Sequence, residues 1–118
     1  MKVNVGNYVR TKDGSIGKIT YISEYNTAIT TDYNTNRNIA KCVGISNIIK
    51  SSPNIIDLIT KGDLIKYHFN GEDYISEVFE YKNDLWVQNE DNLFDISEIN
   101  IKSIVTKEQF EAMEYKIN

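Results

Sequence analysis

The sequence repeats itself, and this repeat constrains the fold more than any other feature. With a shift of 56 residues, similar residues recur in the same order: Gly6 and Gly62, Val9 and Ile65, Arg10 and Lys66, Ile19 and Ile75, Thr20 and Ser76, Ile22 and Val78, Glu24-Tyr25 and Glu80-Tyr81. The motif Ile-Ser-Asn-Ile at 45–48 matches Ile-Ser-Glu-Ile at 96–99 at an offset of 51. We predict two small duplicated units, with the extra residues of the first lying within 31–43. The alternative is chance similarity between two β-meanders.

Turn signals between short apolar runs predict that both units are built of strands. Asp13-Gly14 and Asn70-Gly71 have the chemistry of hairpin turns, because glycine accepts a positive φ. Ile, Val, Tyr and Phe dominate the apolar residues, whereas the helix formers Ala and Leu are scarce. We expect a bulge or close backbone approach at Gly17 and one long strand over 74–81. Since a unit of about 60 residues buries only about 60% of the surface that its unfolded chain exposes, the two units are expected to pack together.

Two short helices are predicted. Ser52-Pro53 is a helix-start signal, and the apolar residues that follow it before Gly62 predict a connector over 53–60. Thr106 and Gln109 have the spacing of a capping box. With Phe110, Met113 and Ile117 on one stripe, they predict a C-terminal helix over 107–116 packed on the second unit.

The opening of the chain resembles the start of KOW-type and other SH3-like barrels. The residues that carry the resemblance are 5–19, in which a strand, an Asp-Gly turn and Ser-Ile-Gly-Lys-Ile follow one another. The resemblance implies a mainly β fold of two tandem SH3-like small barrels, packed together, with a short connector helix and a C-terminal α-helix. The domains are then 1–52, the connector 53–60, and 61–118.

The whole chain is also similar to small uncharacterised accessory proteins of phages and prophages of low-GC Gram-positive bacteria. The resemblance is carried by 5–19, by Asn-Ile-Ile-Asp-Leu-Ile at 54–59, and most specifically by 104–115. It implies a phage accessory gene, of the kind that often encodes regulators or inhibitors of host defence, including anti-CRISPR proteins. It supplies no catalytic residues.

No motif for nucleotide binding, serine hydrolysis or zinc proteolysis occurs, so we predict a protein that is not an enzyme and holds no cofactor or metal. Cys42 and His68 are the only residues of their kinds, too few for a four-ligand zinc site of the usual type. We weighed them as a nucleophilic dyad and expect Cys42 instead to be a small buried hydrophobe. Trp86 is expected in the core, the alternative being a base-stacking platform, and Tyr25 and Tyr81 are expected to close turns.

Charge is divided unevenly between the halves. Residues 1–52 hold seven basic and three acidic side chains, a net +4, whereas 53–118 hold six basic and fourteen acidic ones, a net −8. Acids predicted on successive strands and turns of the second unit could imitate a phosphate backbone and occupy a basic groove meant for nucleic acid. The residues of this predicted acidic face are Glu72, Asp73, Glu77, Glu80, Asp84, Glu90, Asp91 and Asp95. Ordinary solubility charge is the alternative interpretation.

The function expected from these observations is inhibition of a host nucleic-acid-guided nuclease through surface binding to that protein. The alternative is a nucleic-acid-binding or regulatory module that uses a basic face and loop of the first unit. Its candidate residues are Arg10, Lys12, Lys18, Tyr33, Asn34, Arg37 and Lys41. Edge-to-edge strand pairing would give a homodimer. No apolar run reaches the ~18 residues of a membrane span, and we expect a location in the host cytoplasm.

Overall fold

The computed structural model describes residues 3–32 and 40–113, and these residues are mainly β, with three antiparallel sheets and one C-terminal α-helix. The predicted fold class is confirmed at this level. The chain divides into two compact units, Met1–Leu58 and Ile59–Asn118. The predicted 53–60 connector falls at this division, and a short 3-10 helix lies inside it.

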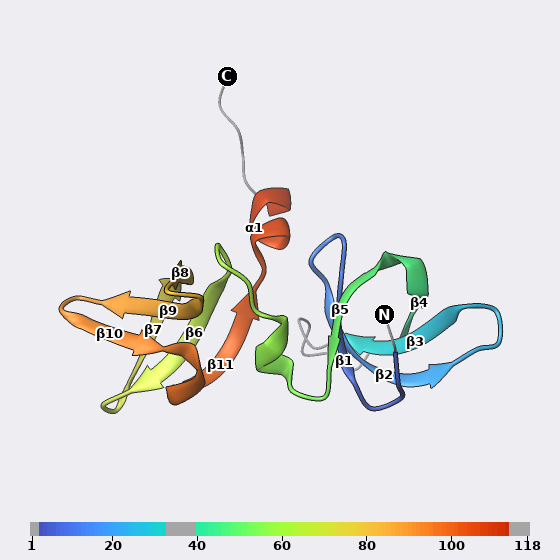
Figure 1. Ribbon diagram of the computed structural model, residues 1–118, viewed down its shortest axis with the longest axis horizontal. Helices are drawn as coiled ribbons and strands as arrows, with labels where there is room; N and C mark the ends of the chain where they lie inside the picture. The colour runs from blue at the N-terminus through green and yellow to red at the C-terminus, as the bar shows by residue number, and fades with distance from the viewer. Residues whose placement is uncertain (1–2, 33–39, 114–118) are drawn as a thin grey trace, which may run out of the picture. The chain divides into compact units, whose positions relative to one another are not determined.

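The first unit holds one five-stranded antiparallel sheet with strand order β4-β3-β2-β1-β5 (Figure 1). Its elements are β1 (Tyr8–Thr11), β2 (Ile16–Ile22), β3 (Thr27–Asp32), β4 (Ala40–Gly44), the 3-10 helix η1 (Ile45–Asn47), β5 (Ile48–Ser52) and the 3-10 helix η2 (Ile55–Leu58). The Asp13-Gly14 turn forms as predicted, with Gly14 at φ 86°. The register slip lies between Ile19 and Tyr21, rather than at Gly17.

The core of the first unit follows from the alternation along these strands. Val9, Ile19, Ala28, Val43 and Ile48 are buried and form one cluster. Each comes from a different strand, β1 to β5, so every strand contributes one apolar side chain to the same interior.

The second unit holds two three-stranded antiparallel sheets, with strand orders β11-β6-β7 and β10-β9-β8 (Figure 1). Its elements are β6 (Leu64–Phe69), β7 (Glu72–Glu77), β8 (Phe79–Tyr81), β9 (Asp84–Asn89), β10 (Asn92–Asp95), the 3-10 helix η3 (Ile96–Glu98), β11 (Asn100–Val105) and the helix α1 (Lys107–Met113). Asn70-Gly71 makes the predicted tight turn, with φ values of 53° and 82°. In the aromatic core of this unit, the ring centroid of Phe94 lies 4.6 Å from that of Phe69 and 6.1 Å from that of Tyr67.

The expected long strand over 74–81 is wrong, because Val78 interrupts it. The amide of Val78 donates to the carbonyl of Asp63 at 2.8 Å, and the amide of Gly62 donates to the carbonyl of Val78 at 2.8 Å. These hydrogen bonds pair Val78 with the residues just before β6, in register with the β6–β7 hairpin, whereas β8 pairs with β9, so β7 and β8 belong to different sheets.

The same pair of hydrogen bonds occurs in the first unit. The Gly6 amide donates to the Ile19 carbonyl, and the Ile19 amide donates to the Asn7 carbonyl, both at 2.8 Å. Gly6 and Gly62 also share a positive φ of 92° and 93°. The structural counterpart of Ile19 is therefore Val78, three residues beyond its sequence match Ile75. Burial agrees, since Ile19 and Val78 are each 1% exposed and Ile75 is 69% exposed.

The C-terminal helix begins where the capping box predicts. The Thr106 amide donates to Gln109 Oε1 at 3.1 Å, and the Gln109 amide donates to Thr106 Oγ1 at 3.3 Å. The end predicted at 116 lies outside the described residues. The expected packing on the second unit is wrong, because Phe110 is 51% and Met113 83% exposed, and α1 has no buried residue. In the part of the chain that the structure describes, no helix is long and apolar enough to cross a membrane.

Candidate functional site

The eight predicted acidic residues all lie on β7 to β10 and the turns between them, and seven of them are exposed. Asp95 is half-buried, because its carboxylate accepts from the Ser97 amide at 2.9 Å and from the Ser97 hydroxyl at 2.8 Å. It thereby caps η3, a structural task that the sequence analysis did not assign to it.

Two further carboxylates are held by neighbours on the β6–β7 hairpin. Asp73 Oδ1 lies 2.8 Å from His68 Nδ1, and Asp73 Oδ2 lies 3.9 Å from Lys66 Nζ. The hydrogen bond from His68 is the main reason why the pKa of Asp73 is below its usual value. Glu72 accepts from the Tyr74 hydroxyl at 2.9 Å, and this bond raises the pKa of Tyr74.

The remaining five carboxylates are available to a partner. Within residues 3–32 and 40–113, no ion pair or side-chain hydrogen bond engages them, and they are Glu77, Glu80, Asp84, Glu90 and Asp91. Glu77, Glu80 and Asp84 lie in or next to β8, and Glu90 and Asp91 form the β9–β10 turn, so Asp84 and this turn lie at opposite ends of β9. A six-residue strand of this kind is roughly 17 Å long. The predicted face is thus two groups of charge rather than one continuous strip.

An open hollow of about 680 Å³ lies beside the first of these groups. Glu77 and Glu80 line it together with three lysines, Lys61, Lys82 and Lys107. Gly62 lets Lys107 approach the backbone, because a Cβ there would meet the Lys107 side chain at 3.3 Å. The mixed charge of this lining does not select one sign of ligand.

Arg10 does not belong to a basic surface, so this part of the prediction is wrong. Its side chain is 0% exposed, and Nη1 donates to the carbonyl of Leu58 at 3.0 Å. Lys66, its match in the repeat, is exposed instead.

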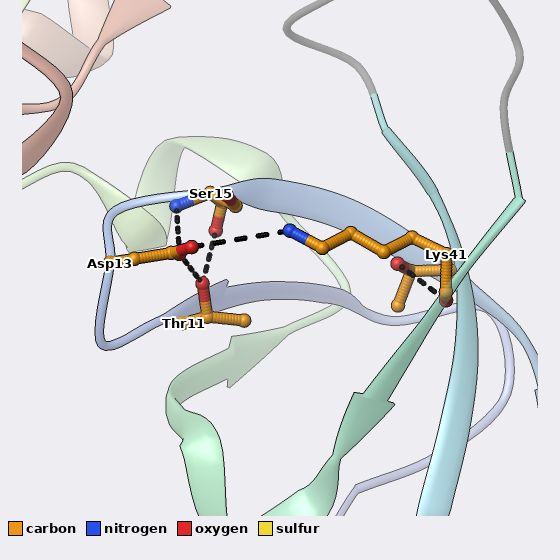
Figure 2. Close-up of polar contacts among 5 residues, drawn as sticks. Thr11, Asp13, Ser15 and Lys41 are labelled. Atoms are coloured by element: carbon orange, nitrogen blue, oxygen red, sulfur yellow. Dashed lines mark hydrogen bonds and ion pairs between the residues drawn. The ribbon is translucent and has the colours of Figure 1, made fainter.

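Lys12 and Lys41 line a cleft of about 270 Å³ between the β1–β2 turn and β4. Lys41 Nζ lies 4.0 Å from the carboxylate of Asp13, and Figure 2 shows the Lys41 side chain extending from its strand toward Asp13 at the turn. Asp13 also accepts from the Thr11 hydroxyl and, at 3.1 Å, from the Ser15 amide. The Thr11 hydrogen bond is the main cause that holds the pKa of Asp13 below its usual value.

Lys18 is the other described basic candidate, and its Nζ lies 5.7 Å from the centre of the Tyr8 ring. Tyr33, Asn34 and Arg37 lie outside the described residues. Among the basic candidates that the structure describes, it therefore brings only Lys12 and Lys41 to one place.

The side chains weighed for chemistry occupy surface positions. Cys42 is exposed on β4, so the prediction that it is buried is wrong. Its neighbour Val43 takes the inward position of this strand instead. In the described residues no group of three or more His, Cys, Asp or Glu could hold a metal ion.

One surface feature, a group of partly exposed aromatic and apolar side chains, was not predicted from the sequence. Tyr81 and Leu93 are 53% and 51% exposed, and Trp86 is half-buried rather than in the core. Val87 fills the core position, at 0% exposure, so Trp86 beside it must point to the other face of β9. Strand alternation was the available signal, but it does not say which of two adjacent apolar residues faces inward.

The second unit thus presents exposed carboxylates and partly exposed aromatic side chains at its surface. No protein-family model, curated protein or solved structure matches the chain.

Proposed function

We propose that this chain is a non-enzymatic phage-type accessory protein that inhibits a host defence nuclease, in the manner of an anti-CRISPR protein. Its second unit places carboxylates in a basic groove that otherwise binds nucleic acid. The observation that carries the proposal is the set of five exposed carboxylates without a partner among the described residues, Glu77, Glu80, Asp84, Glu90 and Asp91.

Carboxylates of this kind suit a basic partner for a physical reason. No neighbouring cation cancels the field of an exposed carboxylate that has no intrachain partner, so that field can steer association. An acid that already pairs with a cationic side chain of the chain contributes less to this field. Asp73, beside His68 and Lys66, is an example. Complementary charge speeds encounter and makes binding sensitive to salt.

The connectivity supports two tandem SH3-like small barrels as the scaffold. In the first unit β1 lies between β2 and β5, and in the second β6 lies between β7 and β11. A 3-10 helix precedes the last strand in both units, at η1 and η3. The last strand also slips register in both, with Ile49 and Lys102 skipped in the pairing. Shared irregularities of this kind favour duplication over chance similarity.

The alternative, nucleic-acid binding by the first unit, has less support. Arg10 is buried, and Lys41 lies beside Asp13. A phosphate-binding surface needs several cations that are free to release counterions.

The test uses a guide-loaded Cas9-type nuclease and its target DNA. We expect the chain to slow target cleavage, and a triple charge reversal to weaken this inhibition about ten-fold or more. The three changes are Glu77→Lys, Glu80→Lys and Glu90→Lys. Inhibition should also weaken when the salt is raised.

The matched control reverses three exposed acids elsewhere, so that net charge changes equally. It carries Glu24→Lys, Glu98→Lys and Glu111→Lys, all at exposed positions. The control should retain most of the inhibition. Absence of inhibition by the unaltered chain, or equal loss in both triple variants, would reject this proposal.

A further inference from the structure

The outer face of the β10-β9-β8 sheet combines aromatic and acidic side chains. The pairing register places Phe79, Trp86 and Asp95 opposite one another across three strands. The same register places Tyr81 opposite Asp84, and Leu93 opposite Gln88. Residues directly opposite in antiparallel strands share a face, with Cβ atoms about 5 Å apart.

The side of the sheet is fixed by its core residues. Val87 is 0% exposed and stands opposite Phe94, whose ring contacts Tyr67 and Phe69 in the core. Trp86 and Asp95 alternate with this pair, so they point to the opposite side. We call this outer side the aromatic–acidic face, comprising Phe79, Tyr81, Asp84, Trp86, Leu93 and Asp95.

Apolar side chains of this face are exposed to solvent. Tyr81 and Leu93 are each about half exposed, at 53% and 51%. The indole of Trp86 is fixed by a hydrogen bond from Nε1 to the Tyr81 carbonyl at 3.1 Å. A rigid, partly exposed tryptophan beside a tyrosine is the kind of anchor that dominates protein interfaces.

The chain itself shows which ligand chemistry the face accepts. Lys82 Nζ lies over the Tyr81 ring, 5.3 Å from its centre. A cation is attracted to the negative face of an aromatic ring, and arginine is the commonest partner in such contacts. Asp84, which stands opposite Tyr81 in the pairing register, adds an exposed carboxylate that favours a positively charged ligand further.

We infer that the aromatic–acidic face docks an arginine- or lysine-rich segment of a partner protein. Guanidinium or ammonium groups stack on Tyr81 and Trp86 and pair with Asp84. The inference rests on the proposed function, because both require a basic partner, and it adds the recognition of that partner through rings as well as charge.

The first test is direct, since Trp86 is the only tryptophan of the chain. The probe is an oligoarginine peptide of about eight residues, roughly 26 Å long when extended. Its addition should change Trp86 fluorescence in a saturable way. Peptide binding, measured with a labelled peptide, that leaves Trp86 emission unchanged would overturn the inference.

Neutral substitutions then separate the rings from the charge. Tyr81→Thr should weaken peptide binding about three-fold, as expected for the loss of one exposed cation–ring contact. Leu93→Thr should weaken it also, by removing apolar contact. The matched control is Ile75→Thr, on the other sheet at 69% exposure, and it should leave binding unchanged. Equal affinity in all three variants would overturn the inference.

Lys82 gives a test of opposite sign. Lys82→Asn removes the ammonium group that lies over the Tyr81 ring. Asparagine tolerates the positive φ of 52° at this position. It should tighten peptide binding more than Lys102→Asn, which removes the same charge from β11. Equal effects would contradict a role for the ring.

The outcomes distinguish this inference from the function on which it rests. If Tyr81→Thr and Leu93→Thr bind the peptide normally while the triple charge reversal does not, the docking face is wrong and charge mimicry stands. If the rings matter for the peptide but the nuclease is not inhibited, the proposed function fails and the face remains a site for basic segments.

Discussion

Arg10 Nη1 donates a hydrogen bond of 3.0 Å to the carbonyl oxygen of Leu58, and both residues are fully buried in the first unit. Arg10 lies in β1, and Leu58 ends η2. The guanidinium thus ties the last turn of this unit to its central hairpin. Removal of the Arg10 guanidinium would leave the buried carbonyl of Leu58 without this hydrogen-bond donor.

Replacement of Arg10 should therefore destabilise the chain. Arg10→Met keeps much of the side-chain volume but removes the donor, and we expect a loss of about 2 kcal/mol or more in the free energy of unfolding. Urea unfolding followed by circular dichroism measures it. The control Lys12→Met, at an exposed neighbour, should change stability by less than about 0.5 kcal/mol. Equal midpoints for the two variants would contradict the structural role.

Asp63 should be equally important to the second unit. It is 0% exposed, and its carboxylate accepts from the Thr60 amide at 2.8 Å and from the Lys107 amide at 2.9 Å. It therefore joins the entry of β6 to the start of α1. Asp63→Ala should lower the free energy of unfolding by about 2 kcal/mol and speed amide hydrogen exchange in α1. Unchanged exchange at Phe110, whose amide donates to the Thr106 carbonyl, would count against this link.

Local turn and cap chemistry could be predicted from the sequence, because each depends on few neighbouring residues. The Asp13-Gly14 and Asn70-Gly71 turns and the Thr106–Gln109 capping box are examples. The burial of Arg10 could not, since it depends on a carbonyl 48 residues away. The same holds for Trp86, whose side of the sheet is decided by what packs against Val87.

The pH response of Asp13 should depend more on a hydroxyl than on a lysine. The Thr11 hydrogen bond is the largest cause of its lowered pKa, and Lys41 is the smallest. Thr11→Val should raise the pKa of Asp13 toward 3.8, and Lys41→Met should raise it less. Titration of the Asp13 carboxyl carbon by NMR measures both. A larger shift in Lys41→Met would contradict this order.

The sign of the stability effect follows from the direction of that shift. A carboxyl with a lowered pKa in the folded state stabilises the fold above its unfolded pKa. This contribution is lost as the pH falls below about 4 and through the folded pKa. The Thr11→Val variant should therefore lose less stability in acid than the unaltered chain, relative to its own value at neutral pH.

The chain should bind nucleic acid weakly if at all. Its net charge is −4, and of the described basic candidates only Lys12 and Lys41 share a cleft. Gel-shift titrations with single- and double-stranded DNA and RNA at low salt, where phosphate contacts are strongest, should show no specific complex. A complex that Lys12→Glu abolishes and Glu24→Lys does not would favour the first unit as the binding module.

The repeat shows most clearly where sequence matching departs from structure. Ile19 matches Ile75 in sequence, but the shared hydrogen bonds to Gly6-Asn7 and Gly62-Asp63 make Val78 its counterpart. A β-branched residue occurs at both 75 and 78, so side-chain type alone does not choose between them. The choice depends on the length of the hairpin, which the turn signals do not fix.

A matched pair of threonine substitutions tests this register. Val78→Thr keeps the shape of a side chain that is 1% exposed but buries a hydroxyl, and should cost about 1–3 kcal/mol of unfolding free energy. Ile75→Thr, at 69% exposure, should cost less than about 0.5 kcal/mol. Urea unfolding of both variants decides between them. If Ile75→Thr proved the more costly, Ile75 rather than Val78 would be the core residue equivalent to Ile19.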